Sequence, residues 1–437
     1  MKHRLTGLCA ALLLAGAAHT QEPAAASATP TAIVLKAAHL FDGRSGNLVS
    51  PGLVVVEGTK IAAVGANAAL PADAKVIDLG DATLVPGYID AHTHIAYDYN
   101  ENWAQGFYEG MLRFPVEQSL HAARNARATL QAGVTSAREV GAADFIDVGL
   151  RNAINAGIAE GPRMLVAGNS LGSTGGHCDS SPFPPERVKP SGPLQGVCNG
   201  PEECRLATRL QMKYGADVIK ICASGGVLSE SDPVDVPQLT PEELRAIVSE
   251  AHAWNRKIAA HSHGDLAAKQ AVEAGVDSIE HGSFLTTPTL QLMKQKGVYL
   301  VPTRMTQVWV LDKADTYPPK IGAKARAAGA AHSDMFRNAL KIGVPIAFGT
   351  DAAVYPHGIN AQEFGDMVDL GMSPSAALLT SSQGSAKLLG IDGETGTLEA
   401  GKFADIVAVP GDVLQNIRAT EKPVLVMKQG VVVETKN

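Results

Sequence analysis

Six residues that can bind a metal ion lie in or just after apolar runs in the central part of the chain. Imidazoles and a carboxylate are ligands that suit Zn²⁺ and similar ions. A lone histidine in such a place is usually a hydrogen-bonded structural residue, but six such groups on five runs are hard to explain one at a time. The set, which predicts a metal site, consists of His92, His94, Lys220, His261, His281 and Asp351.

The spacing and surroundings of these residues favour two ions over one. His92 and His94 are two residues apart, so on a strand both side chains project to the same side. Lys220 lies in "VIKIC", where an unpaired ammonium carries a large desolvation cost. A lysine that has reacted with CO₂ becomes an anionic carbamate and can bridge two ions. Such ions would hold a hydroxide at neutral pH, and Asp351 is placed to take its proton and pass it to a leaving nitrogen.

Other polar residues near these runs are candidates for contacting a substrate. His263 lies two residues beyond His261 and competes with it as a ligand, and we prefer His261 because it is nearer the apolar run. His177 and His357 lie on loops that should border the site, where the alternative role is a loop-stabilising hydrogen bond. Weaker candidates, for holding a substrate carboxylate, are Arg138, Tyr97, Tyr99 and Arg304. The predicted substrate-binding residues are His177, His357, His263, Arg138 and Tyr97.

The apolar runs alternate with segments of helical pattern, as in "TPEELRAIVSEAHAWN", where Thr240 is a plausible N-cap. Strands that are buried on both faces read as continuous apolar runs. Eight runs predict an α/β (β/α)8 TIM-like barrel, whose catalytic groups lie at the carboxyl ends of the strands. The runs begin at "TLVPGYIDAHTH" and continue at 133–141, 163–170, 216–226, 258–264, 278–283, 298–304 and 345–352.

The two ends of the chain have a different character. Residues 31–83 and the last forty residues alternate short β-rich runs with turns and show no long helical period. We expect them to pair into one small β-sandwich domain, formed by 28–84 and 395–437, beside a barrel of residues 85–394. The start, with Lys2 and Arg4 before an apolar stretch, predicts a signal peptide and spacer over residues 1–27.

Charge, the N-terminal segment and the cysteines limit the classes of function and the location that this chain can have. The chain has 437 residues, 44 acidic and 37 basic, and a net charge of -7 without a long basic run, which argues against a nucleic-acid partner. The signal peptide predicts an exported protein, periplasmic or secreted, without stable membrane association after cleavage. In an oxidising compartment two of Cys178, Cys198 and Cys204 can pair, whereas Cys222 is expected to be a buried thiol.

Five motifs in order resemble the amidohydrolase superfamily, metal-dependent hydrolases on a (β/α)8 barrel. They are "PGYIDAHTH", the lysine of "ADVIKICASGG", "AAHSHG", "SIEHG" and "GTD", and "GTLEAGKFADIV" resembles the return into the small β domain. The resemblance implies that His92, His94 and Asp351 bind the first of two divalent ions, expected to be Zn²⁺. It also implies that His261 and His281 bind the second ion and that carboxylated Lys220 bridges the two.

Further segments, "GVTSAREVG", "GGH", "AGVDSIEHG" and "PHGINAQEF", resemble the imidazolonepropionase-like and Xaa-Pro dipeptidase-like branch, which includes ochratoxin-hydrolysing enzymes. Glu139 and Cys178 depart from that branch, which often has Asp and Gly there. The resemblance implies hydrolysis of a small-molecule amide, such as a dipeptide, an N-acyl amino acid or an ochratoxin A-type amide. Hydrolysis of a cyclic amide or lactone and a catalytically inactive metal-binding barrel are the alternatives. Barrels of this kind often associate, so a homo-oligomer stays open.

Overall fold

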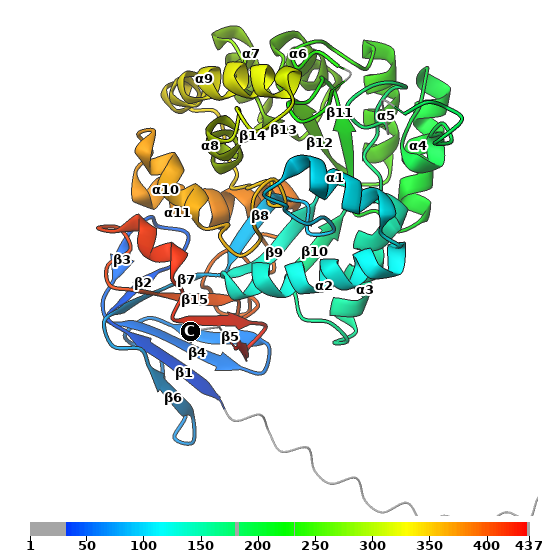
Figure 1. The fold of residues 1–437 in the computed structure, drawn as a ribbon. Coiled ribbons are helices and arrows are strands. Elements are labelled where there is room, and N and C mark those ends of the chain that lie inside the picture. Colours follow the sequence, from blue (N-terminus) through cyan, green and yellow to red (C-terminus); the bar gives the residue numbers. More distant parts are fainter. Residues whose placement is uncertain (1–31, 180–182, 231, 435–437) are drawn as a thin grey trace, which may run out of the picture.

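The computed structural model describes residues 32–179, 183–230 and 232–434 (Figure 1). The predicted signal peptide and spacer, residues 1–27, lie outside the described residues. Within the described ranges, no helix combines the length and the apolar character that a membrane span requires.

Strands from both ends of the chain pair with one another. One sheet has the order β5-β4-β1-β6 and the other the order β17-β16-β15-β7-β2-β3, in which β15 pairs antiparallel with β7. Residues of both sheets belong to one hydrophobic cluster, for example Leu35, Val54, Leu84 and Ile406. The strands are β1 Ile33–Ala37, β2 His39–Phe41, β3 Leu48–Val49, β4 Gly52–Glu57, β5 Lys60–Val64, β6 Lys75–Asp78, β7 Ala82–Pro86, β15 Ile406–Pro410, β16 Leu425–Lys428 and β17 Val431–Val433.

The central part of the chain is a TIM-barrel-like α/β fold, in which strands alternate with helices and all strand pairs are parallel. It contains two sheets, of order β10-β9-β8 and β11-β12-β13-β14. The residues of β8, β9 and β11 are all buried, as the apolar runs predict. The strands are β8 Tyr88–Thr93, β9 Val134–Glu139, β10 Arg163–Val166, β11 Val218–Cys222, β12 Lys257–Ser262, β13 Ser278–His281 and β14 Tyr299–Val301.

The predicted eighth strand, residues 345–352, is not a regular strand. It makes isolated parallel bridges to both neighbours, Leu300 with Ile346 and Thr93 with Ala352. A third bridge, between Leu171 and Ile221, joins the segment after β10 to β11. These bridges connect the edges of the two sheets around the centre, and they bring the carboxyl ends of the strands to one side of the fold.

Helices pack around the outside of these strands (Figure 1). The prediction for Thr240 is confirmed, because its hydroxyl accepts from Glu243 N at 3.3 Å and the Glu243 carboxylate accepts from Thr240 N at 2.7 Å. The helices are α1 Trp103–Leu112, α2 Pro115–Gln131, α3 Ile146–Asn155, α4 Pro201–Lys213, α5 Pro241–Ala253, α6 Asp265–Ala274, α7 Thr287–Lys296, α8 Arg304–Asp312, α9 Pro319–Ile342, α10 Gln362–Asp369, α11 Pro374–Leu379 and α12 Ser385–Leu389.

Candidate metal centre

All six predicted metal ligands line one cavity of about 450 Å³. His92 is near the end of β8 and His94 directly follows that strand, while Lys220 lies on β11. His261 lies on β12 and His281 ends β13. Asp351 lies in the irregular segment between β14 and β8 that replaces the predicted eighth strand. The convergence arises because parallel strands present their carboxyl ends at the same side of the fold.

His92, His94 and Asp351 form the first group of donors. Asp351 Oδ1 lies 3.3 Å from His92 Nε2 and 3.4 Å from His94 Nε2. Burial lowers the pKa of His94 to about 3, so its imidazole is neutral and offers a lone pair. Burial by itself would raise the pKa of Asp351, but the facing His92 and His94 bring it below its usual value, and the carboxylate is ionised.

Although Asp351 Oδ1 lies 3.3 Å away, the buried His92 Nε2 makes no hydrogen bond of good geometry within the described residues. A buried polar atom without such a bond costs free energy, and binding of an ion is one way to satisfy it. Two imidazole nitrogens that converge on one carboxylate oxygen are a donor set that suits Zn²⁺. The residues at this position therefore fit a divalent metal ion.

A second group consists of His261, His263 and His281, whose donor atoms all lie within 4.8 Å of one another. His281 also belongs to a group with His92 and Asp351, so the two sets of donors adjoin. Burial lowers the pKa of His263 to about 3 and the pKa values of His261 and His281 well below their usual range, so all three rings are neutral. His261 and His263, the two candidate ligands at the end of β12, therefore both belong to this group, and each offers a donor atom.

Lys220 is buried between these groups. Burial lowers the pKa of its amine to about 8, although the nearby carboxylates of Glu280 and Asp351 act in the opposite direction. A pKa this close to neutrality leaves part of the amine uncharged, and the uncharged amine is the form that reacts with CO₂. The environment of Lys220 is therefore compatible with the predicted carboxylation.

Two of the ligand positions have a strained backbone. His281 has φ 69° and Asp351 has φ 61°, in the left-handed region that residues other than glycine rarely adopt. Such conformations cost about 1–3 kcal/mol each and persist where the surrounding structure holds them. At both positions the turn aims the side chain into the cavity, since both residues line it.

Glu280 is a candidate positioning residue that the sequence analysis missed. Its Oε2 lies 2.7 Å from His92 Nδ1, and its Oε1 accepts from Arg138 Nη2 at 2.8 Å, with all three side chains buried. The Arg138 and His92 side chains overcome the effect of burial and lower the pKa of Glu280 to about 2. A carboxylate on the outer nitrogen fixes the orientation of a metal-binding imidazole. The sequence signal that could have identified Glu280 was its position as an acidic residue beside His281 in an apolar strand.

Arg138 does not hold a substrate carboxylate, and the prediction for it is corrected. Its side chain is fully buried and does not line the cavity. It donates to Ala91 O, Ser278 Oγ and Glu280, so the Glu280 carboxylate already neutralises its charge inside the fold. The side chain points into the interior because β9 is buried on both faces.

The other predicted substrate contacts divide into two sets. His177, His263 and Tyr97 line the cavity, whereas His357 and Arg304 do not. His357 Nε2 instead donates to Tyr97 O at 2.8 Å, which is the loop-stabilising alternative. Tyr99 lines a neighbouring cavity.

His177 packs so closely on Gly226 that a Cβ there would lie 2.0 Å from the ring, so only glycine fits.

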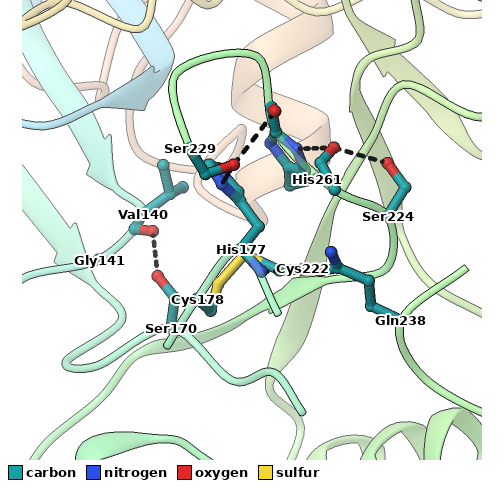
Figure 2. The surroundings of a disulfide bond; sticks show 12 residues. Val140, Gly141, Ser170, His177, Cys178, Cys222, Ser224, Ser229, Gln238 and His261 are labelled. Carbon is teal, nitrogen blue, oxygen red and sulfur yellow. Dashed lines mark hydrogen bonds between the residues drawn. A yellow bond between two sulfur atoms is a disulfide. The ribbon is translucent and has the colours of Figure 1, made fainter. Parts of the chain in front are cut away.

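The cysteines form the disulfides Cys178–Cys222 and Cys198–Cys204. The second is one of the pairings left open by the sequence, but the prediction that Cys222 is a free thiol is wrong. The segment after β10 lies along β11 through the bridge between Leu171 and Ile221 and then turns over the cavity, so Cys178 comes within 5.9 Å of Cys222 (Cα–Cα). Figure 2 shows this disulfide with His177 and His261 beside it. Both of its cysteines line the cavity.

Comparison with known proteins agrees with this geometry. Residues 83–433 match the model of the amidohydrolase family. The ochratoxinase of Aspergillus niger is 33% identical over 356 residues, which cover 78% of this chain and 72% of the relative. Its crystal structure superposes with a TM-score of 0.81 at 30% identity and covers 93% of this chain and 96% of the other.

Two solved structures are also similar. A Xaa-Pro dipeptidase with methionine bound in its active site has a TM-score of 0.89 at 37% identity and covers 92% of this chain and 100% of the other. A prolidase in complex with N-methylphosphonate-L-proline has a TM-score of 0.84 at 29% identity and covers 93% and 100%. The chain therefore belongs to the amidohydrolase family and is a hydrolase that acts on C–N amide bonds.

Proposed function

We propose that this protein uses two divalent metal ions to hydrolyse the amide bond of a dipeptide or an N-acyl amino acid. The observation that carries the proposal is the pair of adjoining donor groups that share His281, in each of which the donor atoms lie within 4.8 Å of one another. Neutral imidazoles with an ionised carboxylate make Zn²⁺ the expected ion.

The roles of the ligands follow from their positions. His92, His94 and Asp351 would hold the first ion, and His261 and His281 the second, with His263, which directly follows β12, as the competing donor. Lys220, once carboxylated, would bridge the two. Glu280 orients the His92 ring through its contact with Nδ1, the nitrogen that faces away from Asp351.

The ions, when bound, supply a nucleophile at neutral pH and polarise the carbonyl of the substrate. The residues of the chain move the proton and contact the substrate. Asp351 Oδ1 is the oxygen that approaches the two imidazoles, so we assign the proton transfer from the attacking water to the leaving nitrogen to its other oxygen. His177 and Tyr97 line the same cavity and are assigned to substrate contact.

The substrate class rests on the relatives as well as on the cavity. The names of the similar proteins refer to an Xaa-Pro dipeptidase, a prolidase and an ochratoxinase. Cavities of about 450 Å³ accommodate molecules of this size. We therefore place dipeptides and N-acyl amino acids first, with ochratoxin A-type amides as a specific candidate.

We also propose that the irregular segment 345–352 closes the barrel in the place of an eighth strand and that 28–84 and 395–437 form a β-sandwich domain beside a barrel of 85–394. Bridges on both sides of 345–352 and the hydrophobic cluster shared by the terminal sheets support this arrangement. Export to the periplasm or the medium is the proposed location. Two disulfides support it, because disulfides persist in oxidising compartments.

A substrate panel tests the proposed function. Zn²⁺-loaded protein is incubated with dipeptides, N-acyl amino acids, cyclic amides and lactones, and release of the free amine or acid is measured. We expect hydrolysis of linear amides. Turnover confined to the cyclic substrates would contradict the proposed substrate class, and no turnover of any compound would contradict the enzymatic function.

A further inference from the structure

A second cavity, of about 370 Å³, opens beside the metal cavity. The two cavities share the lining residues His94, Tyr97, Leu228 and Val354. The second cavity is therefore adjacent to the metal ligands, within reach of a substrate whose amide lies there. None of the proposed catalytic steps requires this space.

Aromatic side chains gather around this second cavity. Aromatic residues make up only 5% of the chain, yet five of them line it. Trp103 and Phe107, one turn apart on α1, have ring centroids 5.5 Å apart and planes within 10° of one another. Phe107 in turn stacks on Phe183 at 5.8 Å. The five aromatic lining residues are Tyr97, Tyr99, Trp103, Phe107 and Tyr317.

The charged side chains that line the second cavity are paired. The Asp98 carboxylate accepts from Arg113 at 2.8 Å and from Arg124 at 2.7 Å. Lys313 also lines this cavity, and its Nζ lies 3.0 Å from Glu101 Oε1 and 5.7 Å from the centroid of the Tyr99 ring. Because the ammonium has a carboxylate partner and an aromatic face, the cavity favours an uncharged flat ring over an anion.

We propose that this second cavity is an aromatic-recognition subsite, which holds an aromatic ring of the amide substrate while the amide bond lies at the metal ligands. The proposal rests on the proposed function and deepens it by naming a substrate class. The ring can belong to the acyl group or to the amino acid, and suitable substrates distinguish the two sources.

The test compares Trp103→Ala with Trp254→Ala. Trp254 is 61% exposed at the end of α5, outside both cavities, and so controls for loss of a tryptophan. Helix α1 has no buried residues, so Trp103→Ala leaves the hydrophobic core intact. The substrates are N-benzoylglycine, with the ring on the acyl group, N-acetyl-L-phenylalanine, with the ring on the amino acid, and N-acetyl-L-alanine, without a ring.

We expect Trp103→Ala to lower kcat/KM about tenfold for one of the two aromatic substrates, through loss of ring contact, and to leave N-acetyl-L-alanine unchanged. Trp254→Ala should match the wild type on all three. Equal effects of Trp103→Ala on all three substrates, or no effect, would overturn the subsite while leaving amide hydrolysis itself established.

A binding measurement tests the subsite without turnover. Calorimetry with 2-naphthalenemethanol, an uncharged aromatic probe, should detect binding to the wild type and to Trp254→Ala. Binding to Trp103→Ala should be at least about fivefold weaker. Absence of binding to the wild type, or equal binding to both variants, would overturn the proposal whatever the activity of the enzyme.

Discussion

His92 Nδ1 lies 2.7 Å from Glu280 Oε2, with both side chains fully buried. This contact occupies the outer nitrogen of the imidazole and turns Nε2 toward Asp351. The ring is thus oriented before any ion arrives.

Glu280→Gln tests that orientation. The variant removes the negative charge behind His92 and leaves the buried Arg138 without its anionic partner. We expect metal affinity to fall about 10–100-fold and thermal stability to fall as well, because a broken buried ion pair costs roughly 3–5 kcal/mol. Metal affinity is measured by competition with a chelator. Glu250→Gln is the matched control, since Glu250 is buried and pairs with Arg209 on the outer helices. Wild-type affinity in Glu280→Gln would contradict the positioning role.

The disulfide at the cavity gives a second prediction. Cys178→Ser/Cys222→Ser should lower kcat/KM about tenfold, because the loop that carries His177 loses its covalent link to β11. The matched control is Cys198→Ser/Cys204→Ser, whose disulfide does not line the cavity. Both are assayed at a temperature at which they are folded. Equal losses of activity in the two double variants would argue against a role at the site.

The same pair of variants separates stability from activity. The disulfides close loops of 44 and 6 residues. Loop-closure entropy therefore predicts losses of about 4 and about 2 kcal/mol in the free energy of unfolding. Urea unfolding of each double variant measures these losses, and a larger loss for Cys198→Ser/Cys204→Ser would contradict the expectation.

Asp351→Asn should abolish hydrolysis while leaving the fold intact. The amide cannot accept and pass on a proton, and general acid–base catalysis contributes about 10²–10⁴-fold to a rate. Substrate turnover is compared with the far-ultraviolet circular dichroism spectrum and the bound metal. Near-normal turnover in a folded, metal-loaded variant would disprove the proton-transfer role.

Lys220 gives a prediction that depends on CO₂. Metal-free protein given Zn²⁺ should recover activity faster with added bicarbonate than in CO₂-depleted buffer, because the carbamate must form before it can bridge. Lys220→Met should recover no activity in either buffer, and Lys257→Met, on the exposed start of β12, serves as its control. Recovery that is independent of CO₂ would contradict the carboxylated lysine.

The convergence of the six candidate ligands on one cavity was predictable from the sequence, because each lies in or just after a buried strand or run and period-2 alternation says which side chains share a face. Thr240 was predictable for a similar reason, since a capping box is a local signal. Both predictions depend only on residues that are close in the sequence.

Arg138, Cys222 and Glu280 were not predictable in this way. Each has a partner far away in the sequence. Ser278 is 140 residues from Arg138, and Cys178 is 44 residues from Cys222. His92 is 188 residues from Glu280. The eighth run reads as a strand, but in the fold it makes only isolated bridges at Ile346 and Ala352, and its backbone is left-handed at Asp351. These features depend on packing across the fold, which local periodicity does not encode.

The central claim is that hydrolysis depends on two metal ions held by this cavity. The most direct measurement follows metal content per chain and amide hydrolysis together, while a chelator removes the ions and Zn²⁺ is then returned. We predict two ions per chain, loss of activity with their removal, and recovery with their return. Full hydrolysis by metal-free protein would contradict the account.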